Sequence, residues 1–122
     1  MSTDSKNFQT IAANINGVHT DISYYKFATN FCLFITQYEK INNVFLVTNE
    51  NTQNGSIKHQ SVNVVHKFGT DTDEIQSAIV YLVKKVPYLQ NLSVDLVLNL
   101  GLKDINRTVL QSLENCLCKI FS

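Results

Sequence analysis

The sequence has few of the residues that interrupt or cross-link a chain. Its 122 residues include one proline, four glycines and three cysteines, and there is no tryptophan. This composition excludes collagen-like and low-complexity chains. The four glycines lie far apart, so no phosphate-binding glycine loop is expected. An odd number of cysteines without a recognisable secretion signal predicts free thiols in a reducing compartment.

Net charge is also absent, because ten basic and ten acidic residues cancel. Binding to nucleic acid or to an anionic membrane would require a basic surface, so neither partner is expected. The first residues, MSTDSKNF, lack the apolar run of a signal peptide, and no later run approaches the length of a membrane span. We therefore expect a cytoplasmic protein, with the nucleus as a further location.

The longest apolar stretch, Asn30 to Asn49 (NFCLFITQYEKINNVFLVTN), organises the interpretation of the rest. Taken in steps of two, both of its halves are largely apolar on both sides, whereas a strand with one wet face alternates apolar and polar residues. The stretch therefore predicts two strands that are covered on both faces. The polar connection Glu39–Asn43 is short, so we expect the two strands to be antiparallel neighbours.

Asn16-Gly17 separates two strand-like segments, Phe8–Ile15 and Val18–Phe27. Both central residues of a type I′ turn need positive φ, which Asn and Gly adopt at low cost, so the pair predicts a β-hairpin. Val62–Phe68 and Ser93–Leu100 are the remaining predicted strands.

The apolar spacing changes to three and four residues in two places, which predicts two amphipathic helices. The first lies within residues 70–87 and the second within residues 104–120, with Asp71 and Asp104 as the expected N-terminal caps. The element order β-β-β-β-β-α-β-α predicts the α+β class. We expect a single six-stranded, mainly antiparallel sheet with two helices on one face.

The expected domain organisation is simple. Residues 1–7 are predicted to be a flexible N-terminus and residues 8–122 a single α+β domain. The polar segment Glu50–Ser61 (ENTQNGSIKHQS) is predicted to be an exposed loop. Its Asn54-Gly55 is either a second hairpin tip or part of a mobile link.

The two helices are too few to cover both faces of the sheet. Side by side they span about 20 Å, enough for one face. On the other face, six to eight large apolar side chains would remain in water, at a cost on the order of 10–20 kcal/mol. We therefore predict that a partner packs on that face, most simply in a sheet-to-sheet dimer. The alternative is a sheet that curls and closes on itself.

The face expected to meet the partner combines residues from the two organising strands and from Ser93–Leu100. The predicted dimer or partner interface is Phe34, Thr36, Tyr38, Phe45, Val47, Asp95 and Val97.

No group of residues predicts catalysis, a metal site or a cofactor site. The three histidines share no metal-ligand spacing. Cys116 and Cys118 are two apart on a predicted helix, so they project about 200° apart around its axis. Cys32 has no base suggested near it. We expect no catalytic residue, no metal and no cofactor.

Several segments resemble the proteasome assembly chaperone 3 family over about residues 11 to 121. They are ITQYEK (35–40), FGTD (68–71) and VDLVLNL (94–100), with Gly17 and Gly69 as further anchors. The resemblance implies a non-catalytic chaperone that needs no ATP, metal or cofactor. It also implies a dimer, with itself or with proteasome assembly chaperone 4, that helps α-type subunits form the first ring of the 20S proteasome.

Two other functions remain open at this point. A curled sheet and the last helix could enclose a cavity for a small apolar ligand. An enzyme would need a lid, for which Glu50–Ser61 is the only segment of sufficient length.

Overall fold

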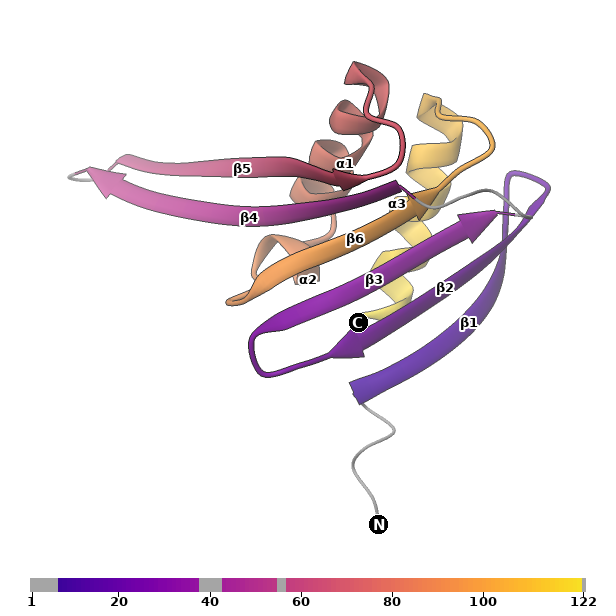
Figure 1. Ribbon diagram of the computed structural model, residues 1–122, viewed down its shortest axis with the longest axis horizontal. Helices are drawn as coiled ribbons and strands as arrows, with labels where there is room; N and C mark the ends of the chain where they lie inside the picture. Colours follow the sequence, from indigo (N-terminus) through magenta and orange to yellow (C-terminus); the bar gives the residue numbers. More distant parts are fainter. Residues whose placement is uncertain (1–6, 38–42, 55–56, 122) are drawn as a thin grey trace, which may run out of the picture.

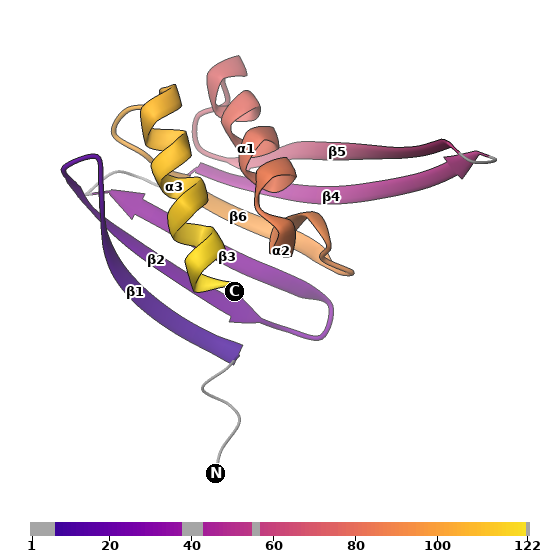
Figure 2. The same ribbon diagram turned by 180° about the vertical axis from the view of Figure 1, so that it is seen from behind.

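The computed structural model describes residues 7–37, 43–54 and 57–121, so of the expected flexible N-terminus only residue 7 is described. One six-stranded sheet carries all helices on one face (Figures 1 and 2). The elements are β1 Phe8–Ile15, β2 Val18–Lys26, β3 Asn30–Gln37, β4 Asn43–Asn54, β5 Ile57–Phe68, α1 Asp73–Lys85, α2 Pro87–Gln90, β6 Asp95–Gly101 and α3 Arg107–Ile120. The α+β prediction is confirmed, with the four-residue α2 as an addition.

The predicted first hairpin is confirmed. Asn16 and Gly17 have φ angles of 55° and 85°, as a type I′ turn requires, and Ile15 pairs with Val18. The Asn14 side chain accepts a hydrogen bond from the Gly17 N–H at 2.8 Å. This turn fixes the register of β1 and β2 along their full length.

The prediction that β3 and β4 are neighbours is wrong. The strand order is β1-β2-β3-β6-β4-β5, so β6 lies between them. It pairs in parallel with β3 and antiparallel with β4, and β3–β6 is the one parallel pair among the described strands. The chain leaves β5 at the sheet edge, crosses one face through α1 and α2, and returns as a central strand.

The prediction of a loop over Glu50–Ser61 is also wrong. β4 and β5 stay paired from Val44↔Phe68 to Asn54↔Ile57, and Gly55 and Ser56 lie outside the described residues. The two strands therefore form a long hairpin that extends past the other strands (Figure 1).

Each long helix begins at a polar side chain that accepts a hydrogen bond from the first turn. Thr72, rather than Asp71, caps α1 by accepting from the Ile75 N–H at 3.1 Å. Asn106, rather than Asp104, caps α3 in the same way. None of the helices in the described ranges is long and apolar enough to span a membrane.

The core lies between the helices and one face of the sheet. Its largest fully buried side chains are Phe31, Phe45, Ile15, Ile22, Leu33, Ile35, Ile79, Leu82, Leu89, Leu96, Leu98 and Leu100. The sheet is open, with β1 and β5 as its edges, so it does not close on itself. Among the described residues, no helix lies on the opposite face of the sheet (Figures 1 and 2).

The turn between β5 and α1 is held against the centre of the sheet by Asn43. Its side chain donates to the Leu100 carbonyl at 3.2 Å and accepts from the Thr70 N–H at 2.6 Å. Gly69 has a φ of 86°, and a Cβ there would run into the Asn43 side chain. The close approach and the left-handed backbone both require glycine at this position.

Candidate protein-binding face

One row of apolar side chains crosses the uncovered face from edge to edge. Cross-strand partners follow one another through all six strands in the order Phe8, Tyr25, Cys32, Val97, Leu46 and Val65. We call these six residues the apolar row. Neighbouring strands lie about 4.8 Å apart, so the row spans roughly 24 Å.

A second row next to it is partly apolar. It runs Thr10, Ser23, Phe34, Asn99, Val44 and Phe68. The Thr10 and Ser23 hydroxyls are hydrogen-bonded at 3.1 Å, and Phe68 is 63% exposed. Three outward positions along each strand cover about 20 Å, so the face measures on the order of 500 Å².

Aromatic rings gather at the corner where β1 begins and β2 ends. The Tyr25 ring stacks on Phe8 at a centroid distance of 4.5 Å and lies 5.9 Å from Phe34 and 6.2 Å from Phe27. Phe8 and Phe27 are 46% and 57% exposed. Aromatic side chains are the usual anchors of protein interfaces, because they bury much surface with little loss of side-chain freedom.

The opposite end of β2 is polar. His19 Nε2 lies 3.0 Å from Asp21 Oδ1, and both side chains are more than half exposed. Asp21 pairs across the ladder with Thr36. An apolar centre with a polar border is typical of a protein interface.

Four of the predicted interface residues lie on the uncovered face. Phe34, Thr36 and Val97 are half-buried there, and Asp95 is exposed at the start of β6. Tyr38 lies outside the described residues.

Two of the predicted residues do not share a face with the other four, as the prediction required. Phe45 and Val47 are 0% and 1% exposed and belong to the core beneath the helices. Their register explains the error: Phe45 pairs with Leu98, and Leu98 pairs with the buried Leu33 rather than with Phe34. The β4 residue in the apolar row is Leu46, which is half-buried and lies outside the core cluster.

The sequence analysis missed the exposed apolar residues nearer the edges of this face. These are Phe8, Tyr25, Phe27, Val65 and Phe68. Phe8 and Tyr25 could have been recognised from the sequence. Counting residue pairs outward from the Asn16-Gly17 turn places Phe8 opposite Tyr25, as the structure does. No comparable local signal marks Val65 or Phe68.

The described part of the chain offers little for an active site. It contains no group of three or more residues that could hold a metal ion. Burial raises the pKa of the Cys32 and Cys116 thiols, which lowers the fraction of reactive thiolate. The described residues of the segment considered as an enzyme lid, 50–54 and 57–61, are strand.

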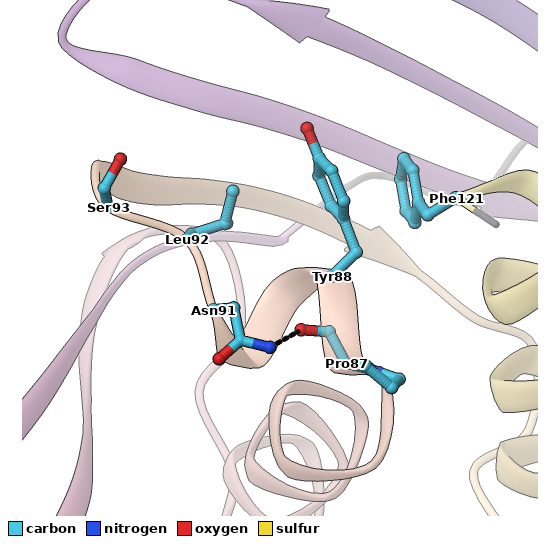
Figure 3. A pocket seen from close by; sticks show the side chains of 6 residues that line it. All are labelled: Pro87, Tyr88, Asn91, Leu92, Ser93 and Phe121. Atoms are coloured by element: carbon cyan, nitrogen blue, oxygen red, sulfur yellow. Dashed lines mark hydrogen bonds between the residues drawn. The ribbon is translucent and has the colours of Figure 1, made fainter.

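A pocket of about 450 Å³ lies where α2 meets the end of α3 (Figure 3). Its wall includes Tyr88 and Phe121, whose rings stack at 4.6 Å, and the Asn91 side chain donates to the Pro87 carbonyl at 2.9 Å. It lies beside the helix ends and not inside a closed sheet. Core residues that include Val109, Leu113 and Leu117 lie on the buried side of α3.

The comparison with known families decides the identity of the chain. The family model described as "Proteasome assembly chaperone 3" matches residues 33–120. The chain belongs to the proteasome assembly chaperone 3 family. Members of this family are non-catalytic assembly chaperones, so the chain is not an enzyme.

A solved structure agrees with this fold. The chain is similar to one in the "Crystal Structure of a Novel Chaperone Complex for Yeast 20S Proteasome Assembly", with a TM-score of 0.68 and 9% sequence identity. The alignment covers 94% of this chain and 98% of the yeast chain. No curated protein sequence matches significantly. At this identity the structural likeness shows the fold alone.

Proposed function

We propose that this proteasome assembly chaperone 3 family protein acts as a dimer that binds 20S proteasome α-type subunits and promotes formation of the α-ring. The apolar row on a face without helices is the observation that supports the dimer. The largest apolar patch on a monomeric protein measures about 300–600 Å² and is often a functional site. A second sheet laid on this face would cover the row at the usual spacing of about 10 Å.

The size of the face fits a stable interface. A standard interface buries about 800 Å² on each partner. The face contributes on the order of 500 Å², which is more than half of that area, and surface beyond the face would have to supply the rest. The partner in the dimer is a second copy of the chain or proteasome assembly chaperone 4.

The client of the dimer is an α-type subunit, and the chain acts as one α+β domain in the cytoplasm. Family membership supports this client class, and the yeast structure is itself a chaperone complex for 20S assembly. The proposal requires no ATP, no metal and no cofactor.

Molar mass and client capture test the two parts of the proposal separately. Light scattering should give twice 13.8 kDa for the chain alone, or a stoichiometric pair when it is co-expressed with proteasome assembly chaperone 4. The immobilised chain should capture at least one recombinant α-type subunit. A strict monomer under both conditions refutes the dimer, and failure to capture any α-type subunit refutes the client.

A matched pair of variants localises the interface. Val97→Asp places a charge in the middle of the apolar row and should abolish the dimer. Gln111→Asp places the same group on the exposed surface of α3 and should leave the dimer intact.

A further inference from the structure

β4 continues well beyond the strand that covers its inner edge. Its pairing with β6 runs from Asn43↔Leu100 to Val47↔Leu96 and then stops. Its pairing with β5 continues to Asn54↔Ile57. Within the described residues, β4 therefore has a neighbouring strand on one side only from Thr48 to Asn54. We call the free side of this segment the ribbon edge, and Figures 1 and 2 show the ribbon projecting beyond the start of β6.

The base of this ribbon is held in place. The Asn49 side chain donates to the Leu89 carbonyl at 3.1 Å and so ties the strand to α2. Opposite it, Val62 and Val64 pack against the core. Beyond this point the ribbon has only two strands, and a two-stranded ribbon is marginally stable in water without further packing.

The ribbon edge presents unpaired backbone groups over a useful length. Seven residues at about 3.4 Å each give roughly 24 Å, and alternate residues direct their N–H and C=O groups to the free side. An added strand of this length would lie beside β4 up to the point where β6 begins.

The sequence does not protect the ribbon edge in the ways that exposed strand edges are usually protected. Natural sheets block such edges with charged side chains, lysine above all, with proline or with a bulge. Thr48–Asn54 contains no proline and no lysine, and Glu50 is its only charged residue. The one register shift between β4 and β5 lies at Val44/Phe45, far from the ribbon edge.

We propose that the ribbon edge binds an extended segment of the client α-type subunit as a third strand. This inference rests on the proposed function. Residues 50–61 include a single apolar residue, Ile57, so main-chain hydrogen bonds rather than apolar burial supply the recognition. The fitting segment is correspondingly extended, mostly polar and free of proline.

A second copy of the chain is a poorer occupant of the ribbon edge. Pairing of two ribbon edges would create a second self-complementary contact in addition to the sheet-to-sheet dimer. Two such contacts on one chain lead to tetramers or open chains rather than to a closed dimer. A segment of a different protein joins the edge without this consequence.

A trimmed variant tests the inference. Replacing Glu50–Ser61 by Asn-Gly keeps Asn49 and Val62 paired across a two-residue turn. The variant should keep its circular dichroism and its dimer mass, and its Kd for the captured α-type subunit should rise at least tenfold. If the affinity for the α-type subunit is unchanged, the inference is overturned and the proposed function stands. If the oligomeric mass changes, the ribbon edge pairs copies of the chain with each other, and the inference is again overturned.

A backbone-specific pair of variants covers the case in which the trimmed chain does not fold. In the free protein, hydrogen exchange identifies which of Thr52 and Gln53 has its amide on the free edge, because that amide exchanges faster. Proline there should weaken client binding at least tenfold, whereas alanine, which keeps the N–H, should not. Equal effects of both substitutions would mean that side chains carry the contact, which refutes the inference. If the unmodified chain captures no α-type subunit, the proposed function itself fails.

Discussion

Leu46 and Phe45 provide a sharp test of which face of the sheet is the interface. They are adjacent in β4 and point to opposite faces: Leu46 belongs to the apolar row, and Phe45 is fully buried under the helices. Leu46→Asp should therefore give a folded monomer, whereas Phe45→Asp should unfold the chain.

The expected size of the Leu46→Asp effect follows from burial. Because Leu46 is already half-buried in the monomer, losing its contact with the partner costs about 1 kcal/mol; desolvating the carboxylate costs about 2 more, so each substituted copy loses roughly 3 kcal/mol. A homodimer contains the change twice, which gives about 6 kcal/mol, or roughly a 10⁴-fold higher Kd. In a heterodimer the change enters once and the factor is about 10².

The monomer should tolerate Leu46→Asp because Leu46 lies outside the core cluster. Its free energy of unfolding should fall by about 1–2 kcal/mol, because Leu46 is half-buried, and this leaves a domain of ordinary stability folded. Phe45→Asp buries a charge in the core, at a cost comparable with the typical 5–15 kcal/mol of total stability. Sedimentation velocity and urea unfolding measure both quantities. A Leu46→Asp chain that stays dimeric, or a Phe45→Asp chain that folds as a monomer, would refute the assignment of faces.

Three further substitutions test the fold. Gly69→Ala combines a left-handed φ with a steric clash and should lower the free energy of unfolding in urea by about 2–3 kcal/mol. The control Gly17→Ala should lower it by about 1 kcal/mol, because the added Cβ meets no other atom there. Equal losses in the two variants would contradict the clash. Thr72→Ala should cost about 1 kcal/mol by removing the α1 cap, and Thr72→Ser should restore it. The hydrogen bond to Glu114 raises the pKa of Tyr81 above 10, so its stabilisation is present below pH 10 and is lost as pH rises through the raised pKa. Tyr81→Phe should therefore flatten the alkaline decline of stability, and an unchanged profile would contradict this.

The parts of the fold that the sequence predicts correctly depend on short-range signals. The Asn16-Gly17 turn requires positive φ at both residues, and only a few residue types adopt it readily. The two long helices follow from apolar spacing within a single segment. Their caps were predicted a residue or two too early, because Asp71 and Asp104 lie beside the residues, Thr72 and Asn106, that accept the bonds.

The assignment of faces depends on long-range contacts that no single segment contains. The predicted alternation of side chains between the two faces is correct within β3 and within β4. In β3 and in Val44–Val47 of β4, however, both faces are apolar. Nothing local therefore says whether Leu33 or Phe34, or Phe45 or Leu46, is covered by helices. The insertion of β6 decides it, because its register aligns Leu33 with Phe45 through Leu98. A shift of one residue would exchange the two faces completely.

The ribbon shows why a polar segment is not sufficient evidence for a loop. Residues 50–61 contribute almost no apolar side chains, so pattern and composition both predict an irregular segment. Strand pairing nevertheless continues outward from the core, because Val47↔Val64 and Asn49↔Val62 already fix the register. Once two strands are aligned, each further pair needs no additional loop closure, and main-chain hydrogen bonds suffice to extend it. A hairpin that extends in this way retains an unpaired edge. That edge is the feature from which binding of a client segment as a third strand is inferred.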